Sequence, residues 1–199
     1  MKISILLPYK ENFSSNYAGS VSLFVSDTTK LSKFKKNILI YGSTKYKNKL
    51  LKNYTNINFK KYFFKSSTNT YIDKFLSIEK KNYSDFIEIH NRPEYIDKIY
   101  EKNKNIIFYF HNNPLDMKSA KRIEDRYNIL NKSKLIIFNS FWTLKQFKKN
   151  LSLKKYKKKL IVIYQSTNKK KINFRKKENL IIFVGRLNTS KGYDVFGKA

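Results

Sequence analysis

Seven short apolar runs constrain the fold of this chain more than any other feature. Each run is continuous rather than alternating, and each is rich in Ile, Leu, Val, Phe or Tyr. Strands that are buried on both faces of a parallel sheet have this pattern. The runs span residues 3–7, 38–41, 86–89, 106–110, 135–138, 160–164 and 180–184, and residues 57–64 (INFKKYFF) are a weaker candidate for a further strand.

Stretches with helical spacing lie between these runs, for example around Tyr71, Phe75 and Ile78. The helix over 141–151 is expected to begin at Ser140, and the helix before it at Asp116 or Ser119, because Ser and Asp are common N-cap residues. Strands that alternate with helices predict right-handed crossovers. The expected fold is therefore α/β, a doubly wound Rossmann-like parallel sheet.

The organisation changes after residue 164. Residues 165–179 are polar and basic without a helical stripe, which is typical of a linker. Residues 180–199 then read as a strand, a loop and the start of a helix over 191–199. A lone strand and a nine-residue helix are too small to be stable alone. We therefore expect one domain over 1–164 and the first βα unit of a second, incomplete domain over 180–199.

Charge and composition limit the partners and the compartment. The chain has 43 Lys and Arg against 14 Asp and Glu, a net charge of +29, which attracts nucleic acid or an anionic membrane face. Compositional drift in an AT-rich genome is the alternative, since most lysines are spread along the chain. Dense runs at 154–159, 169–171 and 175–177 are the exception. The absence of cysteine, signal peptide and membrane-spanning run predicts a cytoplasmic protein, with peripheral attachment to the inner membrane face as an added expectation.

Both histidines of the chain directly follow a predicted strand. Because ligands bind at the carboxyl ends of parallel strands, His90, Asn91, Arg92 and His111 are candidate binding residues. A histidine there orients a hydroxyl or moves a proton. The structural alternatives are a helix capped by Asn91 and a histidine bonded to backbone.

Glycines and cations mark two further loops. Gly185-Arg186 leaves the last apolar run, and Lys191-Gly192 begins the final helical segment. Two cations at a strand–helix junction suit a diphosphate, and the alternative is a solvated pair. Gly19, before a predicted helix, allows close approach of a phosphate, although many loops need a glycine for backbone reasons. Neither a Walker P-loop nor a G-x-G-x-x-G motif occurs.

These loops, in this order, resemble those of the family 4 glycosyltransferases of GT-B fold, which retain anomeric configuration. The stretch FVGRLNTSKGYDVFGKA is similar to the opening of the family's C-terminal domain, and IEIHNRPEYI and IIFYFHNNP resemble two stretches of its N-terminal domain. The resemblance covers essentially the whole chain. It implies transfer of a sugar from a UDP, GDP or ADP sugar to a saccharide or lipid-linked acceptor in cell-envelope glycan synthesis, for example of lipopolysaccharide.

The resemblance also implies roles for single residues, with the nucleotide sugar as substrate and no metal or other cofactor. His111 would lie beside the transferred sugar as the catalytic residue, and residues 1–164 would form the acceptor-side domain. The donor-phosphate residues would be Gly19, Gly185, Arg186, Lys191 and Gly192, and the acceptor-side residues His90, Asn91 and Arg92.

The chain departs from the family pattern at three places. Ser20 stands where the family has a second glycine, and Gln165-Ser166 stands where it has Asn-Gly. The Glu-x7-Glu element of the donor domain is absent, so we expect little or no transferase activity from this chain alone. Two other functions stay open: a basic nucleic-acid-binding α/β protein, and a non-catalytic accessory domain of the same fold.

Overall fold

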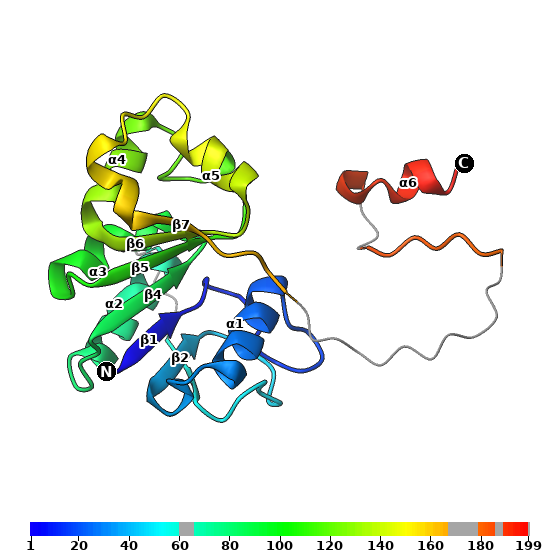
Figure 1. Ribbon diagram of the computed structural model, residues 1–199. Coiled ribbons are helices and arrows are strands. Elements are labelled where there is room, and N and C mark those ends of the chain that lie inside the picture. Colours follow the sequence, from blue (N-terminus) through cyan, green and yellow to red (C-terminus); the bar gives the residue numbers. More distant parts are fainter. Residues whose placement is uncertain (60–65, 167–178, 186–188, 199) are drawn as a thin grey trace. The chain divides into compact units, whose positions relative to one another are not determined.

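The computed structural model describes residues 1–59, 66–166, 179–185 and 189–198 (Figure 1). The chain divides into two compact units, Met1–Gln165 and Ser166–Ala199. The larger unit holds the sheet and the five longer helices of the described chain. In the smaller unit, the described residues form the turn η5 (Thr189–Lys191) and the short helix α6 (Tyr193–Phe196).

The sheet of the larger unit has seven strands, all parallel, in the order β3-β2-β1-β4-β5-β6-β7. This Rossmann-like order reverses between β1 and β4, where ligands bind in such sheets. The predicted α/β parallel sheet is confirmed. The strands are β1 (Ile3–Leu6), β2 (Ile38–Gly42), β3 (Tyr54–Asn56), β4 (Phe86–His90), β5 (Ile106–Phe110), β6 (Ser133–Phe138) and β7 (Leu160–Val162).

Helices lie on both faces of the sheet (Figure 1). Four 3-10 turns accompany them within the described part of the larger unit, and Pro93 and Pro114 each open one. The helices are α1 (Ser20–Leu31), α2 (Ser67–Glu79), α3 (Ile96–Lys102), α4 (Ile123–Lys132) and α5 (Phe141–Lys148), and the turns are η1 (Lys35–Asn37), η2 (Pro93–Tyr95), η3 (Pro114–Asp116) and η4 (Lys154–Lys159).

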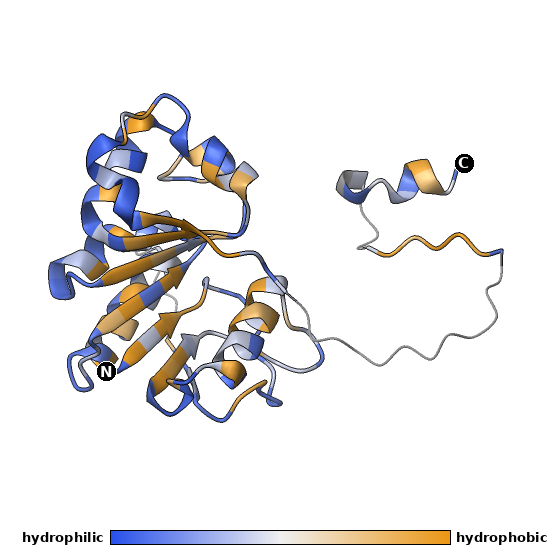
Figure 2. Cartoon of the chain, viewed as in Figure 1, coloured by the Kyte–Doolittle hydropathy of each residue, from blue (hydrophilic) through white to orange (hydrophobic). Residues whose placement is uncertain are grey.

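Alternation along the strands divides the core into two clusters. Ile5 of β1 and Leu7, which follows the strand, join Val25 of α1 in one cluster, whereas Leu6 joins Phe75 of α2 in the other. Successive side chains of a strand point to opposite faces, so α1 covers one face while α2–α5 pack on the other. Figure 2 shows hydrophobic residues along the strands and hydrophilic residues on the connecting turns.

Two strand predictions need correction. In place of the strand expected at 57–64, the described chain has β3 at Tyr54–Asn56; residues 57–59 form no strand, and 60–64 lie outside the described residues. Its pairing stops where β2 ends, at Gly42. Residues 180–184 form no strand, and Val184 is 91% exposed. A strand needs a hydrogen-bonded neighbour, and no described residue pairs with this run.

The helix starts are partly as expected. Ser140 caps α5, and its hydroxyl accepts a hydrogen bond from the Thr143 amide at 3.1 Å. The preceding helix begins at Ile123 rather than after Asp116 or Ser119, so that prediction was wrong. Asp116 belongs to η3, which Pro114 opens, and Ser119 has a positive φ of 61° that a helix does not accept.

The other sequence boundaries are only partly described. Of the expected linker over 165–179, residues 167–178 lie outside the described residues. The helix expected over 191–199 is α6, which is four residues long. Within the described parts of the chain, no helix has the length and apolar character needed to span a bilayer.

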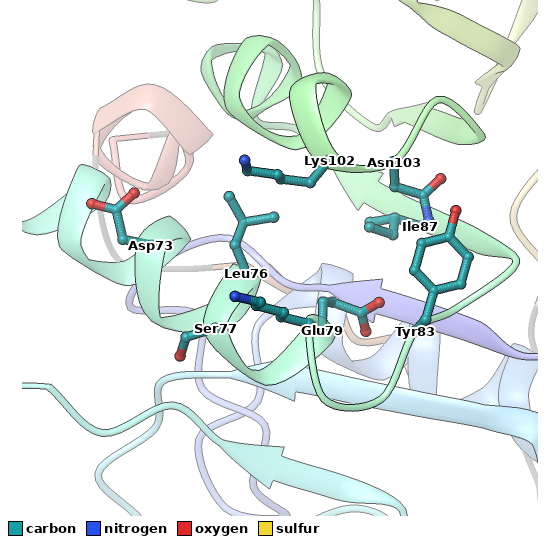
Figure 3. Close-up of a pocket in the computed structure, with 9 residues that line it drawn as sticks. Asp73, Leu76, Ser77, Glu79, Tyr83, Ile87, Lys102 and Asn103 are labelled. Atoms are coloured by element: carbon teal, nitrogen blue, oxygen red, sulfur yellow. The ribbon is translucent and has the colours of Figure 1, made fainter.

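A buried carboxylate joins three elements at the amino-terminal edge of the sheet. Glu79, at the end of α2, is 5% exposed and accepts hydrogen bonds from the Ser4 hydroxyl of β1 and from the Ser84 amide and hydroxyl, both at 3.2 Å. It borders a hollow of about 530 Å³ between the ends of α2 and α3, lined also by Leu76 and Ile87 (Figure 3). All the described hydrogen-bond partners of Glu79 are donors from other elements of the fold. The carboxylate therefore links these elements and stabilises the fold.

We expect Glu79→Ala to lower the free energy of unfolding by about 3 kcal/mol, because the substitution leaves the buried Ser84 amide and one of the two mutually bonded hydroxyls of Ser4 and Ser84 without an acceptor. Chemical denaturation followed by circular dichroism measures this. Glu101→Ala, which removes the same charge from the exposed side of α3, is the control. Equal stability of the two variants would contradict a structural role for the Glu79 carboxylate.

Candidate functional site

The parallel pairing of β4 and β5 brings the two histidines together. His90 ends β4 and pairs in register with Tyr109 of β5, and His111 follows β5. Glu88, His90, Tyr109 and His111 occupy alternate positions, so their side chains point to the same face of the sheet. This is the face that α1 covers over β1 and β2.

A chain of hydrogen bonds runs along this face. His90 Nε2 lies 2.7 Å from Glu88 Oε1, and His90 Nδ1 lies 2.8 Å from His111 Nε2. His111 Nδ1 lies 2.7 Å from Gln165 Nε2, just beyond β7. The Glu88 carboxylate accepts and the Gln165 amide nitrogen donates. Each of the two neutral histidines then carries its one ring proton on Nε2, and Nδ1 of His111 is an acceptor.

Aromatic rings enclose this chain. The rings of His90 and His111 are each stacked with Tyr109, at 5.4 and 4.4 Å between centroids, and Phe24 of α1 meets His111 edge-on at 5.1 Å. Burial, followed by repulsion from His90, lowers the pKa of His111 from 6.5 to about 2. Burial, followed by the Glu88 charge, raises the pKa of Tyr109 to about 12. The His111 ring is therefore neutral at physiological pH.

The backbone of His111 is held by the neighbouring loops. The buried Asn91 side chain accepts from the His111 amide at 2.8 Å, and Asn139, after β6, donates to the His111 carbonyl at 2.8 Å. Asn91 has a positive φ of 50°, which asparagine tolerates better than most residues. Loops after β4, β6 and β7 thus all bond to His111, the last through Gln165.

Arg92 and Gly19 lie near this edge with other partners. Arg92 donates to the Asn91 carbonyl at 3.0 Å and lies 3.9 Å from the Glu94 carboxylate. Gly19 is the N-cap of α1, and a Cβ there would lie 2.0 Å from Glu11 Oε1. The Glu11 carboxylate also accepts from the Ser22 amide at 3.3 Å. The anion at the start of α1 is therefore the chain's own Glu11.

The expected phosphate loop lies in the smaller unit and is only partly described. Arg186 is outside the described residues. Lys191 ends η5 with its side chain exposed, and Gly192 has a φ of 73° at the start of α6. A glycine is needed there because other residues rarely adopt this conformation.

The structure therefore brings together His90, Asn91 and His111 among the predicted residues. Sequence reasoning missed Glu88 and Gln165 as their partners. Glu88 had a detectable signal, since it stands two residues before His90 within an apolar strand and so shares its face. Gln165 had none, because its contact with His111 depends on how β7 is placed in the sheet.

Among the described residues, no three histidine, aspartate or glutamate side chains come together as metal ligands would. Comparison with models of known protein families and with curated protein sequences gives no match. The geometry of the sheet edge therefore carries the functional argument.

We expect the His111 ring to stay neutral from pH 8 down to about pH 5, because its folded pKa is about 2. The unfolded chain, in which the histidine pKa is about 6.5, binds a proton on this ring below that pH, and the folded chain does not. The stability that the neutral ring confers is therefore complete above about pH 6.5 and decreases as the pH falls below 6.5.

Proton NMR of the two histidine Cε1 positions tests this, with His111→Gln to assign the signals. A His111 signal that titrates with a midpoint near pH 6.5 would contradict the partly buried, neutral ring.

Proposed function

We propose that this chain belongs to a nucleotide-sugar-dependent glycosyltransferase of GT-B type and forms its acceptor-side domain with the opening of its donor domain. The sugar passes from a nucleoside diphosphate to a saccharide or lipid-linked acceptor of the cell envelope. The motif resemblance around His90, His111 and residues 183–199 supports this, together with the Rossmann-like sheet.

The observation that carries the proposal is the hydrogen-bonded chain from Glu88 through His90 to His111. It ends at the carboxyl edge of β5, one strand away from the point between β1 and β4 where the strand order reverses. That edge is where parallel sheets of this kind bind ligands. A neutral, oriented histidine at this edge suits the recognition of a sugar hydroxyl.

The tautomers define what His111 does in this proposal. Glu88 holds the proton on Nε2 of His90, and His90 in turn holds the proton on Nε2 of His111. Nδ1 of His111 then accepts a hydrogen bond, from Gln165 in this structure and from a sugar hydroxyl when Gln165 turns away. His111 positions the sugar, and its low pKa keeps it from acting as a cation.

The donor side of the proposal rests on Arg186 and Lys191. Two cations near a diphosphate offset the charge that develops as the nucleotide leaves. This arrangement needs no metal ion.

Membrane attachment through the lysine run of η4 is a further part of the proposal. Tyr156 is buried there and Lys159 donates to the carbonyls of Leu130 and Ser133, so the remaining lysines face solvent. The runs at 169–171 and 175–177 lie outside the described residues. Phe141 and Trp142 on α5 are 64% and 56% exposed. Exposed aromatic rings favour a lipid surface and exposed lysines favour an anionic one, so α5 and η4 are each assigned to membrane contact.

We expect UDP, GDP or ADP to bind the protein, and the double variant Arg186→Ala, Lys191→Ala to weaken binding at least about tenfold. Each charge-assisted hydrogen bond to a phosphate contributes about 1.5–3 kcal/mol. Isothermal titration calorimetry measures this, with Lys118→Ala, Arg122→Ala as a control of equal charge change on exposed residues.

Two outcomes would contradict the proposal. One is nucleoside diphosphate binding that is equally strong in the variant of Arg186 and Lys191 and in the control variant of Lys118 and Arg122. The other is tight binding of an oligonucleotide, with a steep salt dependence and no effect of nucleoside diphosphates, which would favour the nucleic-acid-binding alternative.

We expect the fluorescence of Trp142, the chain's single tryptophan, to shift to shorter wavelength with phosphatidylglycerol vesicles and not with phosphatidylcholine vesicles. Replacing Lys154, Lys155, Lys157 and Lys158 by Gln should remove the shift, because the anionic surface attracts these charges. Emission spectra at low and high salt measure the effect. An unchanged shift in the Gln variant would overturn the assignment of the membrane face to η4.

A further inference from the structure

A second hollow lies at the carboxyl edge of the sheet, at the end opposite β7. Its volume is about 730 Å³, which falls in the range of small-molecule sites. Its walls come from the loop after β2 and the residues that follow β3, with Tyr9 from the loop after β1. The same sheet edge carries His90 and His111, but the hollow uses neither of them.

The charge of this hollow has one sign. Lys45, Lys47 and Lys49 line it at alternate positions of the loop after β2, and none of the described residues that line it is acidic. Lys49 is partly buried. Its Nζ donates to the Tyr46 carbonyl and lies 5.3 Å from the centroid of the Tyr54 ring. Lys45 and Lys47 are exposed. A ligand with a negative charge is therefore favoured.

The remaining groups suit a sugar. The Asn56 side-chain oxygen accepts a hydrogen bond of 2.9 Å from the Thr44 backbone amide, which fixes the Asn56 amide group in the wall. Tyr46 is 39% exposed and stacks on Tyr17 at 4.2 Å, which holds its ring in place. An adjoining hollow of about 100 Å³ shares Tyr46 and Lys47.

The buried Ser14 also lines the smaller hollow, and its hydroxyl has no hydrogen-bond partner within the described chain. An unpartnered buried hydroxyl favours a ligand group that can donate to it or accept from it. Sugar hydroxyls do both.

We infer that this hollow binds a saccharide that carries a phosphate or carboxylate group. The lysines meet the charged group, while the Tyr46 ring, the Asn56 amide and, in the adjoining hollow, the Ser14 hydroxyl meet the sugar. The inference rests on the proposed function, for which it names the acceptor class as an anionic saccharide. Binding at this site requires neither the donor nucleotide nor catalysis.

Calorimetric titration of the protein with glucose 6-phosphate, glucuronate, glucose and inorganic phosphate tests the inference. We expect one or both anionic sugars to bind more tightly than glucose and inorganic phosphate. Lys45→Gln, Lys47→Gln, Lys49→Gln should weaken that binding about tenfold or more. The double variant Lys45→Gln, Lys47→Gln, which leaves the partly buried Lys49 in place, should also weaken it.

The matched control is Lys33→Gln, Lys35→Gln, Lys36→Gln, which removes three exposed lysines at the amino end of β2. Equal loss in the pocket and control variants would mean general attraction to a basic protein and would overturn the inference. Tyr46→Ala should weaken sugar phosphate binding by about threefold, because it removes the ring face, and should leave inorganic phosphate unaffected.

Absence of any anionic sugar binding also overturns the inference. Nucleoside diphosphate binding that depends on Arg186 and Lys191 would then still support the proposed transferase. The reverse result, anionic sugar binding without nucleotide binding, would retain the hollow as a binding site and contradict the transferase. The two failures are therefore distinguishable.

Discussion

The parallel pairing of β4 with β5 is the constraint on which the candidate site depends. The register sets His90 opposite Tyr109, so the next side chain on the same face is that of His111, just after β5, and its Nε2 lies 2.8 Å from His90 Nδ1. A shift of one residue would send one histidine to the opposite face, among the apolar residues that α2–α5 cover. The apolar core of the sheet maintains this register, and the polar chain depends on it.

Three acidic residues of this basic chain have specific structural tasks. The chain has 14 of them against 43 lysines and arginines. Glu79 joins α2 to β1 and the loop before β4, Glu11 lies at the start of α1, and Glu88 orients His90. In each case the carboxylate accepts from a defined donor inside the larger unit. Lysines dominate the remaining charge of the chain, which agrees with the affinity for an anionic saccharide proposed at the hollow beside β2 and β3.

Particular elements show how far the sequence could predict the site. The runs 86–89 and 106–110 predicted two strands, and His90 and His111 followed at the same edge, as observed. The run 180–184 was equally apolar and yet forms no strand, because an apolar pattern does not provide a neighbour to pair with. The role of Gly19 likewise depended on a side chain eight residues earlier, Glu11, that its own loop pattern did not indicate.

The sequence by itself determined the class of fold and the edge at which chemistry gathers, because burial on both faces requires continuous apolar strands and parallel strands align their carboxyl ends. Only the tertiary structure decided which polar side chains meet. Gln165 reaches His111 across 54 residues, and Lys45, Lys47 and Lys49 share a hollow with residues that follow another strand. Such contacts depend on strand order and loop paths, which are set by the packing of the whole sheet rather than by any local pattern.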